Sequence, residues 1–347
     1  MPLPVLLDLV VTDTSAATPG ADPAPVGLAA ADAIAAAAQA VGVTALRLLD
    51  GVPGRLGVDP TVVAGYLAGR HAGLGYLVDL PTTGNAPYNA ARRVLSLDRA
   101  ASGRAGVVLR PGAGDEVSDA AVPDPAASDP VERWTEYAWI LGRLWESFPR
   151  TALLGDQERA LVVDDALVRE IAHTGRFYRV AGPLDGPSSV QGRPVLVAAD
   201  LDVLDWAAIA VSADVVSVSR EQAPGADAAL TAALDRVGRS RVDVALVGRT
   251  AVAPVDAGRA GAVAGELDGW VDADRLDGLE LQVGGDPAEI AATLRALVPQ
   301  LVPQLVPQLV PQLVAPGRAD GPGGDGLRAS LGLRASLGLP AVAGVLA

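Results

Sequence analysis

The stretch "GRPVLVAADLDVLDWAA", from Gly192 to Ala208, holds a short strand, a polar turn and the beginning of a helix. Its segment 195–197 is apolar and largely β-branched, as in strands that are buried on both faces of a parallel sheet. Asp200, Asp202 and Asp205 follow it. The loop after the carboxyl end of a strand is the usual place for a ligand in α/β proteins. The stretch therefore predicts one strand–loop–helix unit with a candidate site in its loop.

The same unit recurs along the chain. Apolar strands are expected at 5–11, 45–50, 73–79, 105–110, 194–199, 214–219, 242–248 and 277–283. Helices are expected at 29–41, 60–71, 88–101, 130–148, 204–211, 226–237, 257–270 and 287–297. Pro60 and Pro287 stand at first-turn positions after Asp59 and Asp286, which favours helix starts there. Eight strand–helix units match a (β/α)₈ TIM barrel, whereas a doubly wound sheet usually has fewer strands. No G-x-G-x-x-G run follows the first strand, which also disfavours a dinucleotide fold.

Two segments interrupt the repeating pattern. We expect one barrel domain over residues 1–298, with a lid-like excursion over 149–192 between the fourth and fifth strands. Residues 299–347 are expected to form a Pro/Gly-rich tail. "LVPQ" occurs four times over 297–312 and "LRASLG" twice over 327–338. Proline at every fourth position disfavours an α-helix. The repeats are interpreted as replication slippage in a tolerant surface tail rather than as a proline-rich docking segment.

Composition narrows the classes of function. The chain has 347 residues, a formal net charge of −14, two His and no Cys. An acidic surface repels phosphates, so no nucleic-acid partner is expected. The lack of Cys and scarcity of His leave little for a metal site or a Ser-His-Asp triad, so no metal is predicted. The amino-terminal "MPLPVLLDLVVTD" has no basic residues and is interrupted by Asp8. It is predicted to be a strand rather than a signal or membrane span, in a cytoplasmic protein.

One run carries a family signal: "GNAPYNAARRVLSLDRAASGRAG", residues 84–106. It resembles the N-E-P-Y-N-x-A-R-R-F run of bacterial-luciferase-like flavin monooxygenases, in the group of nitrilotriacetate, EDTA and dibenzothiophene-sulfone monooxygenases. The runs "LLDG" (48–51), "RLWESF" (143–148) and "GRFYRVAGPLDGPSSVQGRPVLVAA" (175–199) are also similar to that group. The resemblance implies a luciferase-like TIM barrel with FMN at the carboxyl ends of its strands, in a divergent member of the family.

The resemblance also implies particular residues. Asp50 matches the family's L-A-D-G aspartate and Thr83 matches a threonine just before the N-E-P-Y-N run; both would contact FMN, with Arg110 nearby. The loop carrying Asp200, Asp202 and Asp205 aligns with a family A-G-x-S-x-x-G loop that holds the flavin phosphate. Acids there place like charges beside a dianion, and one such pair at 4–6 Å costs roughly 2–4 kcal/mol at an effective dielectric of 20. No catalytic residue is assigned.

Arginines could offset these acids. Arg110, Arg220 and Arg249 each follow a predicted strand. We expect them to pair with the loop carboxylates, because a buried charge needs a partner; binding of an anion elsewhere at the mouth is the alternative.

Three functions stay open at this point. The first is a two-component monooxygenase that uses reduced FMN from a separate flavin reductase, O₂ and a small organic substrate. The second is a degenerate luciferase-like barrel that no longer binds flavin and acts as a binding or partner subunit. The third is use of the deazaflavin F420, which also carries phosphate and meets the same acids. A homo-oligomer is expected from the resemblance alone.

Overall fold

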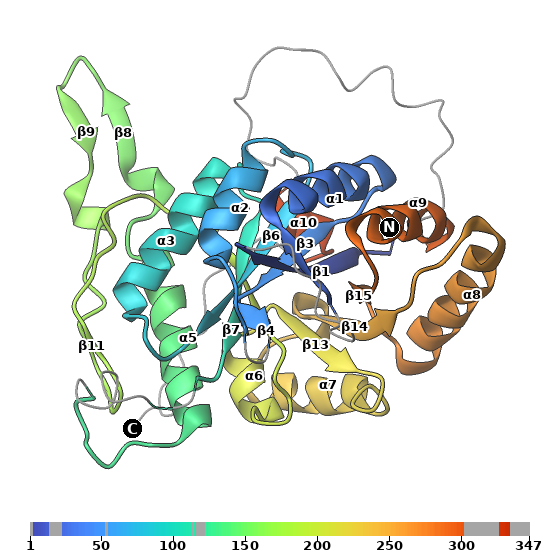
Figure 1. Cartoon of the computed structure of the whole chain (residues 1–347). Coiled ribbons are helices and arrows are strands. Elements are labelled where there is room, and N and C mark those ends of the chain that lie inside the picture. The colour runs from blue at the N-terminus through green and yellow to red at the C-terminus, as the bar shows by residue number, and fades with distance from the viewer. Residues whose placement is uncertain are drawn as a thin grey trace.

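The computed structural model describes residues 3–13, 23–52, 55–112, 114, 122–301 and 326–333. Figure 1 shows a ring of strands enclosed by helices. The second LVPQ copy after Leu301, the third and fourth LVPQ copies, and all of the second LRASLG copy except Leu333 lie outside the described residues. None of the described helices is long and apolar enough to cross a bilayer.

Eight parallel strands form the barrel, and each overlaps a strand expected from the sequence. They are β1 (Val5–Thr12), β3 (Ala45–Leu49), β6 (Gly75–Pro81), β7 (Ala105–Arg110), β12 (Val195–Ala198), β13 (Val215–Ser219), β14 (Ala245–Val252) and β15 (Gly278–Val283). Neighbours pair in chain order, and the ring closes where Val5 of β1 pairs with Leu279 of β15. The expected TIM barrel is confirmed. A short strand β2 (Pro25–Gly27) pairs with the end of β1, and β4 (Gly51–Val52) pairs with β5 (Arg55–Leu56).

Helices cover the outside of the barrel. They are α1 (Leu28–Val41), α2 (Pro60–Ala68), α3 (Pro87–Ala100), α5 (Pro130–Glu146), α6 (Trp206–Ser212), α7 (Ala226–Arg236), α8 (Ala257–Asp274) and α9 (Pro287–Leu301). The Asp-Pro starts are confirmed: Asp59 accepts a hydrogen bond from the backbone N of Thr61 at 2.8 Å, and Asp286 from that of Ala288 at 2.8 Å. Each cap satisfies a backbone donor that the first helical turn leaves free.

Helix α9 corrects one expectation. The first LVPQ copy, residues 297–300, is helical, with Pro299 inside the last turn of α9. A proline in the final turn removes only one backbone hydrogen bond. The neighbouring Leu297, Val298 and Leu301 are buried in the main core, which stabilises the turn.

The barrel interior changes character along its axis. Side chains alternate inward and outward along each strand. The inward positions nearest the amino-terminal end are apolar and form a cluster of their own: Leu6, Ala45, Leu77, Val108, Val195, Val197, Val215, Ala245 and Val247. Two residues further along, several inward positions are charged. The apolar layer therefore forms a floor beneath a polar interior.

A segment from near the carboxyl terminus closes the floor from outside. Helix α10 (Leu327–Ser330) places Leu327 in the floor cluster with Leu331 and Leu333, and Leu327 is fully buried. An added Cβ at Gly75 would lie 2.6 Å from the Leu327 side chain, so Leu327 occupies the space that this glycine leaves. The first LRASLG copy is thus part of the core, which corrects its interpretation as a tolerant surface tail.

An ion-pair cluster holds the same segment in place. Arg328 donates to both carboxylate oxygens of Asp214, at 2.7 and 3.0 Å, and Arg193 donates to Asp214 at 2.6 Å. Burial opposes ionisation of Asp214, but the two arginines outweigh it and lower the Asp214 pKa to about 2.

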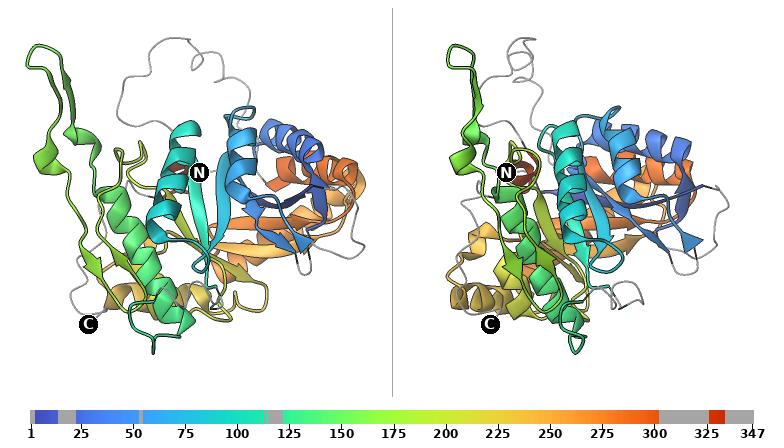
Figure 2. Two further views of the ribbon diagram at one scale, coloured as in Figure 1. Left: turned by 60° about the vertical axis from the view of Figure 1, so that its left-hand side comes forward. Right: turned by 90° about the vertical axis from the view of Figure 1, so that its left-hand side faces the viewer.

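The excursion between β7 and β12 contains two small hairpins. One joins β8 (Leu153–Asp156) to β9 (Leu161–Val163), and the other joins β10 (His173–Thr174) to β11 (Arg179–Val180). The β8–β9 hairpin extends away from the body of the barrel (Figures 1 and 2). Its role as a lid stays a prediction, as does the domain boundary at residue 298.

Candidate functional site

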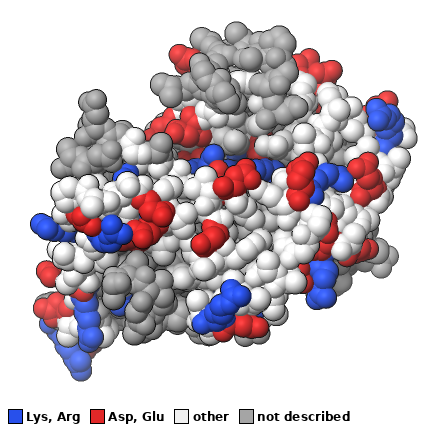
Figure 3. Space-filling model, turned by 90° about the horizontal axis from the view of Figure 1, so that it is seen from below, with Lys and Arg blue, Asp and Glu red and all other residues white. Residues whose placement is uncertain are grey.

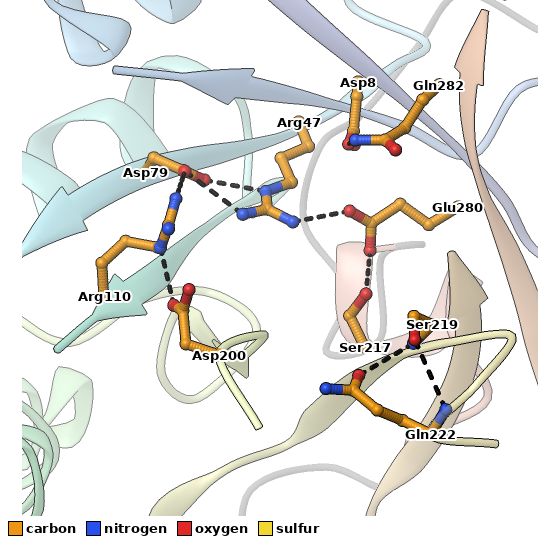
Figure 4. A network of polar contacts seen from close by, with 10 residues as sticks. All are labelled: Asp8, Arg47, Asp79, Arg110, Asp200, Ser217, Ser219, Gln222, Glu280 and Gln282. Atoms are coloured by element: carbon orange, nitrogen blue, oxygen red, sulfur yellow. Dashed lines mark hydrogen bonds and ion pairs between the residues drawn. The ribbon is translucent and has the colours of Figure 1, made fainter. Parts of the chain in front are cut away.

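Four strands each contribute one fully buried charged side chain to the barrel interior above the apolar floor (Figure 4). Asp8, Arg47, Asp79 and Glu280 lie on β1, β3, β6 and β15 and are all at least 97% buried. Each follows an apolar or glycine residue two positions earlier on the same strand, so it faces inward as the strand period requires.

Ion pairs connect these residues across the barrel. Arg47 donates from Nε to Asp79 Oδ1 at 2.8 Å and from Nη1 to Glu280 Oε1 at 2.6 Å. Arg110, at the end of β7, donates from Nη1 to the other Asp79 oxygen at 2.9 Å and from Nε to Asp200 Oδ2 at 2.6 Å. The network fixes both guanidinium groups, because each is held by two carboxylates.

Asp8 differs from the other charged residues of the interior because only one of its carboxylate oxygens accepts a hydrogen bond from a described residue. Its Oδ2 accepts a hydrogen bond from Gln282 at 3.0 Å, while its Oδ1 has no hydrogen-bond partner in the described structure. Burial and then the negative charge of Glu280 raise the Asp8 pKa well above its usual value. For Glu280 itself, burial is outweighed by the positive charges of Arg47 and Arg249, so its pKa is lowered. The two shifts therefore favour the proton on Asp8 and the negative charge on Glu280.

A cavity of about 640 Å³ opens above the network at the carboxyl ends of the strands. Its lining includes Arg47, Arg110, Arg220 and Arg249, with Leu49 and Gln282. Glu221 is the single acidic residue that lines it among the described residues. On the molecular face in Figure 3, acidic and basic side chains are interspersed. The four arginines that line the cavity contrast with this mixed surface and with the net charge of −14 of the whole chain.

The three residues predicted to contact a cofactor follow neighbouring strands. Asp50 is exposed after β3, and burial together with Asp79 and Asp59 raises its pKa. Thr83 follows β6 and lies against Gly112, where an added Cβ would collide with Thr83 Oγ1. Arg110 ends β7 and lines the cavity. Because β3, β6 and β7 are adjacent in the sheet, all three residues lie on one side of the mouth.

Several proteins of known function are similar to this chain in sequence over part of its length. A component of pristinamycin IIA synthase from Streptomyces pristinaespiralis is 31% identical over 202 residues, which is 55% of this chain and 65% of that protein. Dibenzothiophene-sulfone monooxygenase from Rhodococcus erythropolis is 30% identical over 155 residues, which is 44% of this chain and 34% of that protein. The matched segments therefore cover less than two thirds of either relative. No family model matches the chain.

Solved structures extend the likeness over nearly the whole chain. EDTA monooxygenase from Chelativorans sp. BNC1 superposes with a TM-score of 0.71 and 18% identity, covering 96% of this chain and 99% of that one. The oxygenating constituent of 3,6-diketocamphane monooxygenase from Pseudomonas putida, in complex with FMN, gives a TM-score of 0.57 and 12% identity, covering 88% and 99%. The chain therefore shares the barrel fold of these monooxygenases over nearly its whole length, and it is similar to such enzymes in sequence over about half of it.

The loop after β12 aligns with the phosphate loop of the luciferase-like family. Its acidic side chains all contact other residues of this chain. Asp200 pairs with Arg110, as expected for an acid–arginine pair. Asp202 accepts a hydrogen bond from Gln222 at 2.9 Å, and Asp205 caps α6 by accepting from the backbone N of Ala208 at 2.8 Å.

The other two arginines do not pair with these acids. Arg220 pairs instead with Glu266 at 3.1 Å. Arg249 has no hydrogen bond or ion pair to any residue in the described part of the chain. The expected pairing with the loop acids therefore holds for Arg110 alone.

A second cavity, of about 650 Å³, lies beside the luciferase-like N-A-P-Y-N run. Tyr88, Phe177 and Tyr178 contribute aromatic surface to its wall. The Tyr178 hydroxyl donates to the Thr82 carbonyl at 2.8 Å, and the Arg133 guanidinium lies 5.2 Å from the Phe177 ring centre. This cavity is therefore more aromatic than the arginine-lined mouth.

Both histidines have carboxylate partners outside the mouth. His71 Nε2 lies 2.8 Å from Asp32, and His173 Nε2 lies 2.9 Å from Glu136. Neither lines the arginine-rich cavity. Their contacts fit the structural role that is usual for histidine.

Sequence reasoning did not select the interior network. Asp8, Arg47, Asp79 and Glu280 each stand alone in an otherwise apolar strand run. Lone charges at inward positions of buried strands are expensive unless paired. A single charged residue at an inward position in each of four apolar strands is the sequence pattern that could have predicted the network.

Proposed function

We propose that the chain is the oxygenase component of a two-component flavin-dependent monooxygenase. It would take reduced FMN from a separate flavin reductase, together with O₂ and a small organic substrate. The observation that carries this proposal is the arginine-lined cavity at the carboxyl end of a luciferase-like barrel. In TIM-barrel enzymes this end of the barrel holds the active site.

The residues at the mouth fit a phosphate-bearing flavin. The cavity volume lies within the range of about 300–1,000 Å³ that is usual for ligand pockets. Its cations suit a phosphate, and Leu49 offers an apolar surface for a ring system. When bound and reduced, flavin supplies the electrons that activate O₂, while the protein provides position and exclusion of water.

On this proposal, Asp50, Thr83 and Arg110 contact the flavin from the β3–β6–β7 side. Arg110 is held by Asp79 and Asp200, so it presents a fixed positive group rather than a mobile one. Thr83 offers a hydroxyl beside Gly112, a position where a larger residue would collide with it.

The second cavity is proposed to bind the organic substrate. Its aromatic wall favours an apolar or aromatic portion, and Arg133 in the same wall favours an anionic substituent. Thr82 lines this cavity, and its neighbour Thr83 is a proposed flavin contact. Substrate and cofactor would therefore meet at the end of β6.

Flavin titration tests the proposal. Oxidised FMN, and reduced FMN under anaerobic conditions, are added to the protein while flavin fluorescence or absorbance is followed. We expect saturable binding that is weakened severalfold by Thr83→Ala. Asn89→Ala is the matched control, because Asn89 belongs to the same family-like run but is exposed. No binding of either redox form up to about 1 mM, about 4 kcal/mol of binding free energy, would refute the monooxygenase and favour a barrel that has lost flavin.

A further inference from the structure

Arg249 differs from the other cations of the mouth. Arg47 and Arg110 each contact two carboxylates, and Arg220 contacts one. Arg249 is partly buried, lines the cavity and has no ion pair among the described residues. A partly buried charge without a direct ion pair is unfavourable unless a ligand supplies the partner.

The carboxylate on the neighbouring strand does not neutralise Arg249 by direct contact. Glu280 is its register partner on β15, and the charge of Arg249 contributes to lowering the Glu280 pKa. Both Glu280 oxygens already accept hydrogen bonds, one from Arg47 and the other from Ser217 at 2.5 Å. The guanidinium of Arg249 therefore keeps all its donors for the cavity.

Arg220 stands beside Arg249 in a fixed orientation. Its guanidinium lies 4.5 Å from the Trp270 ring centre, and its Nε donates to Thr250 Oγ1 at 3.2 Å. Its ion-pair partner Glu266 is 69% exposed, so water screens much of that carboxylate's charge. Stacking on Trp270 of α8 thus fixes the orientation of Arg220, a second positively charged residue that lines the same cavity.

The neighbouring loop after β12 is less suited to an anion. There Asp200, Asp202 and Asp205 place three carboxylates in the loop after β12. Asp205 also takes the backbone donor at the start of α6 that a ligand would need. Phosphates in TIM barrels often bind instead near the ends of the last two strands, and β14, which carries Arg249, is the first of these two.

From these observations we infer that Arg249, assisted by Arg220, forms a phosphate subsite at the ends of β13 and β14. This inference rests on the proposed function for the identity of its ligand: the phosphate monoester of FMN. The phosphate would be held beside the family-like loop, at the ends of the next two strands rather than in the loop itself, with the Asp50, Thr83 and Arg110 side left to the rest of the flavin.

The test compares FMN with riboflavin, which lacks the phosphate. For the unmodified protein we expect FMN to bind at least tenfold more tightly. Arg249→Gln should weaken FMN binding by about tenfold to a hundredfold, as expected for loss of a charge-assisted hydrogen bond, and leave riboflavin binding within twofold. Arg249→Lys should retain part of the preference. Arg295→Gln, at an exposed position on α9, is the control.

Two further measurements, thermal stability and the binding of inorganic phosphate, complete the experiment. Arg249→Gln removes no direct ion pair among the described residues, only the longer-range attraction to Glu280, so its thermal midpoint should stay close to that of the unmodified protein. Inorganic phosphate should bind the unmodified protein, detected by ³¹P line broadening, and bind Arg249→Gln at least tenfold more weakly.

The outcomes separate the two proposals. Equal affinity for both flavins, or equal loss of both in Arg249→Gln, overturns the subsite. If neither flavin binds but phosphate binding depends on Arg249, the subsite stands for another phosphate ester and the monooxygenase proposal fails. Phosphate binding that is independent of Arg249 overturns the inference in either case.

Discussion

Replacing Asp8 with Asn should change how the stability of the protein depends on pH. In the folded state, burial and then Glu280 raise the Asp8 pKa well above its value in the unfolded chain, about 3.9. Between those two pKa values the folded state binds one more proton than the unfolded state. The free energy of unfolding therefore falls by about 1.4 kcal/mol per pH unit as pH rises through that interval.

Asp8→Asn removes this slope because an amide has the shape of the protonated acid but does not titrate. Its side-chain oxygen can still accept the hydrogen bond from Gln282. Near pH 4 the variant and the parent should differ little. At higher pH the variant should gain in relative stability, by about 1.4 kcal/mol per unit, until the folded-state pKa is reached.

Urea unfolding at pH 5, 6, 7 and 8, at constant ionic strength, measures this difference. Asp235→Asn, an exposed carboxylate on α7, is the matched control and should give a difference that does not vary with pH. A constant difference for Asp8→Asn across the series would mean that Asp8 is ionised in the folded protein, and the electrostatic account of the network would then be wrong.

Three further substitutions probe the network, the floor and the loop. Asp79→Asn removes the carboxylate that Arg47 and Arg110 share and should lower the free energy of unfolding by about 3–5 kcal/mol in urea titrations; a loss below about 1 kcal/mol would contradict the pairing. Leu327→Ala opens a cavity in the barrel floor and should cost about 2–5 kcal/mol, visible as a lower thermal midpoint; an unchanged midpoint would argue against a buried Leu327. Asp205→Ala should cost about 1 kcal/mol in urea by removing the α6 cap, and an unaltered urea midpoint would exclude that cap.

The fold could be read from the sequence because local signals agree with the global architecture. Buried parallel strands are apolar on both faces, and Asp-Pro pairs mark helix starts at Pro60 and Pro287. The barrel arrangement then follows from the count of units, since neighbouring strands pair in chain order. Helix α10 was not predicted, because a perfect tandem repeat gives no indication of which copy packs against the barrel.

The site was only partly accessible from the sequence. The pairing of Arg110 with Asp200 could be predicted because both follow neighbouring strands, β7 and β12. The contact between Arg47 and Glu280 joins residues 233 positions apart, and it depends on closure of the ring and on strand register. Arg249 makes no ion pair with a described carboxylate because Glu280 already accepts hydrogen bonds from other residues. Only the side-chain geometry reveals these hydrogen bonds.

The segment that seals the amino-terminal end of the barrel affects how the chain can vary in length. Residues 327–333 and 333–339 both read Leu-Arg-Ala-Ser-Leu-Gly-Leu. Loss of either six-residue copy leaves the same heptad directly after Gly326, so the seal would be rebuilt from identical residues. Gain or loss of LVPQ units alters the length of chain between α9 and Gly326, and doubling such a connection costs only about 0.6 kcal/mol. Repeat-number variants should therefore arise readily and keep the barrel closed.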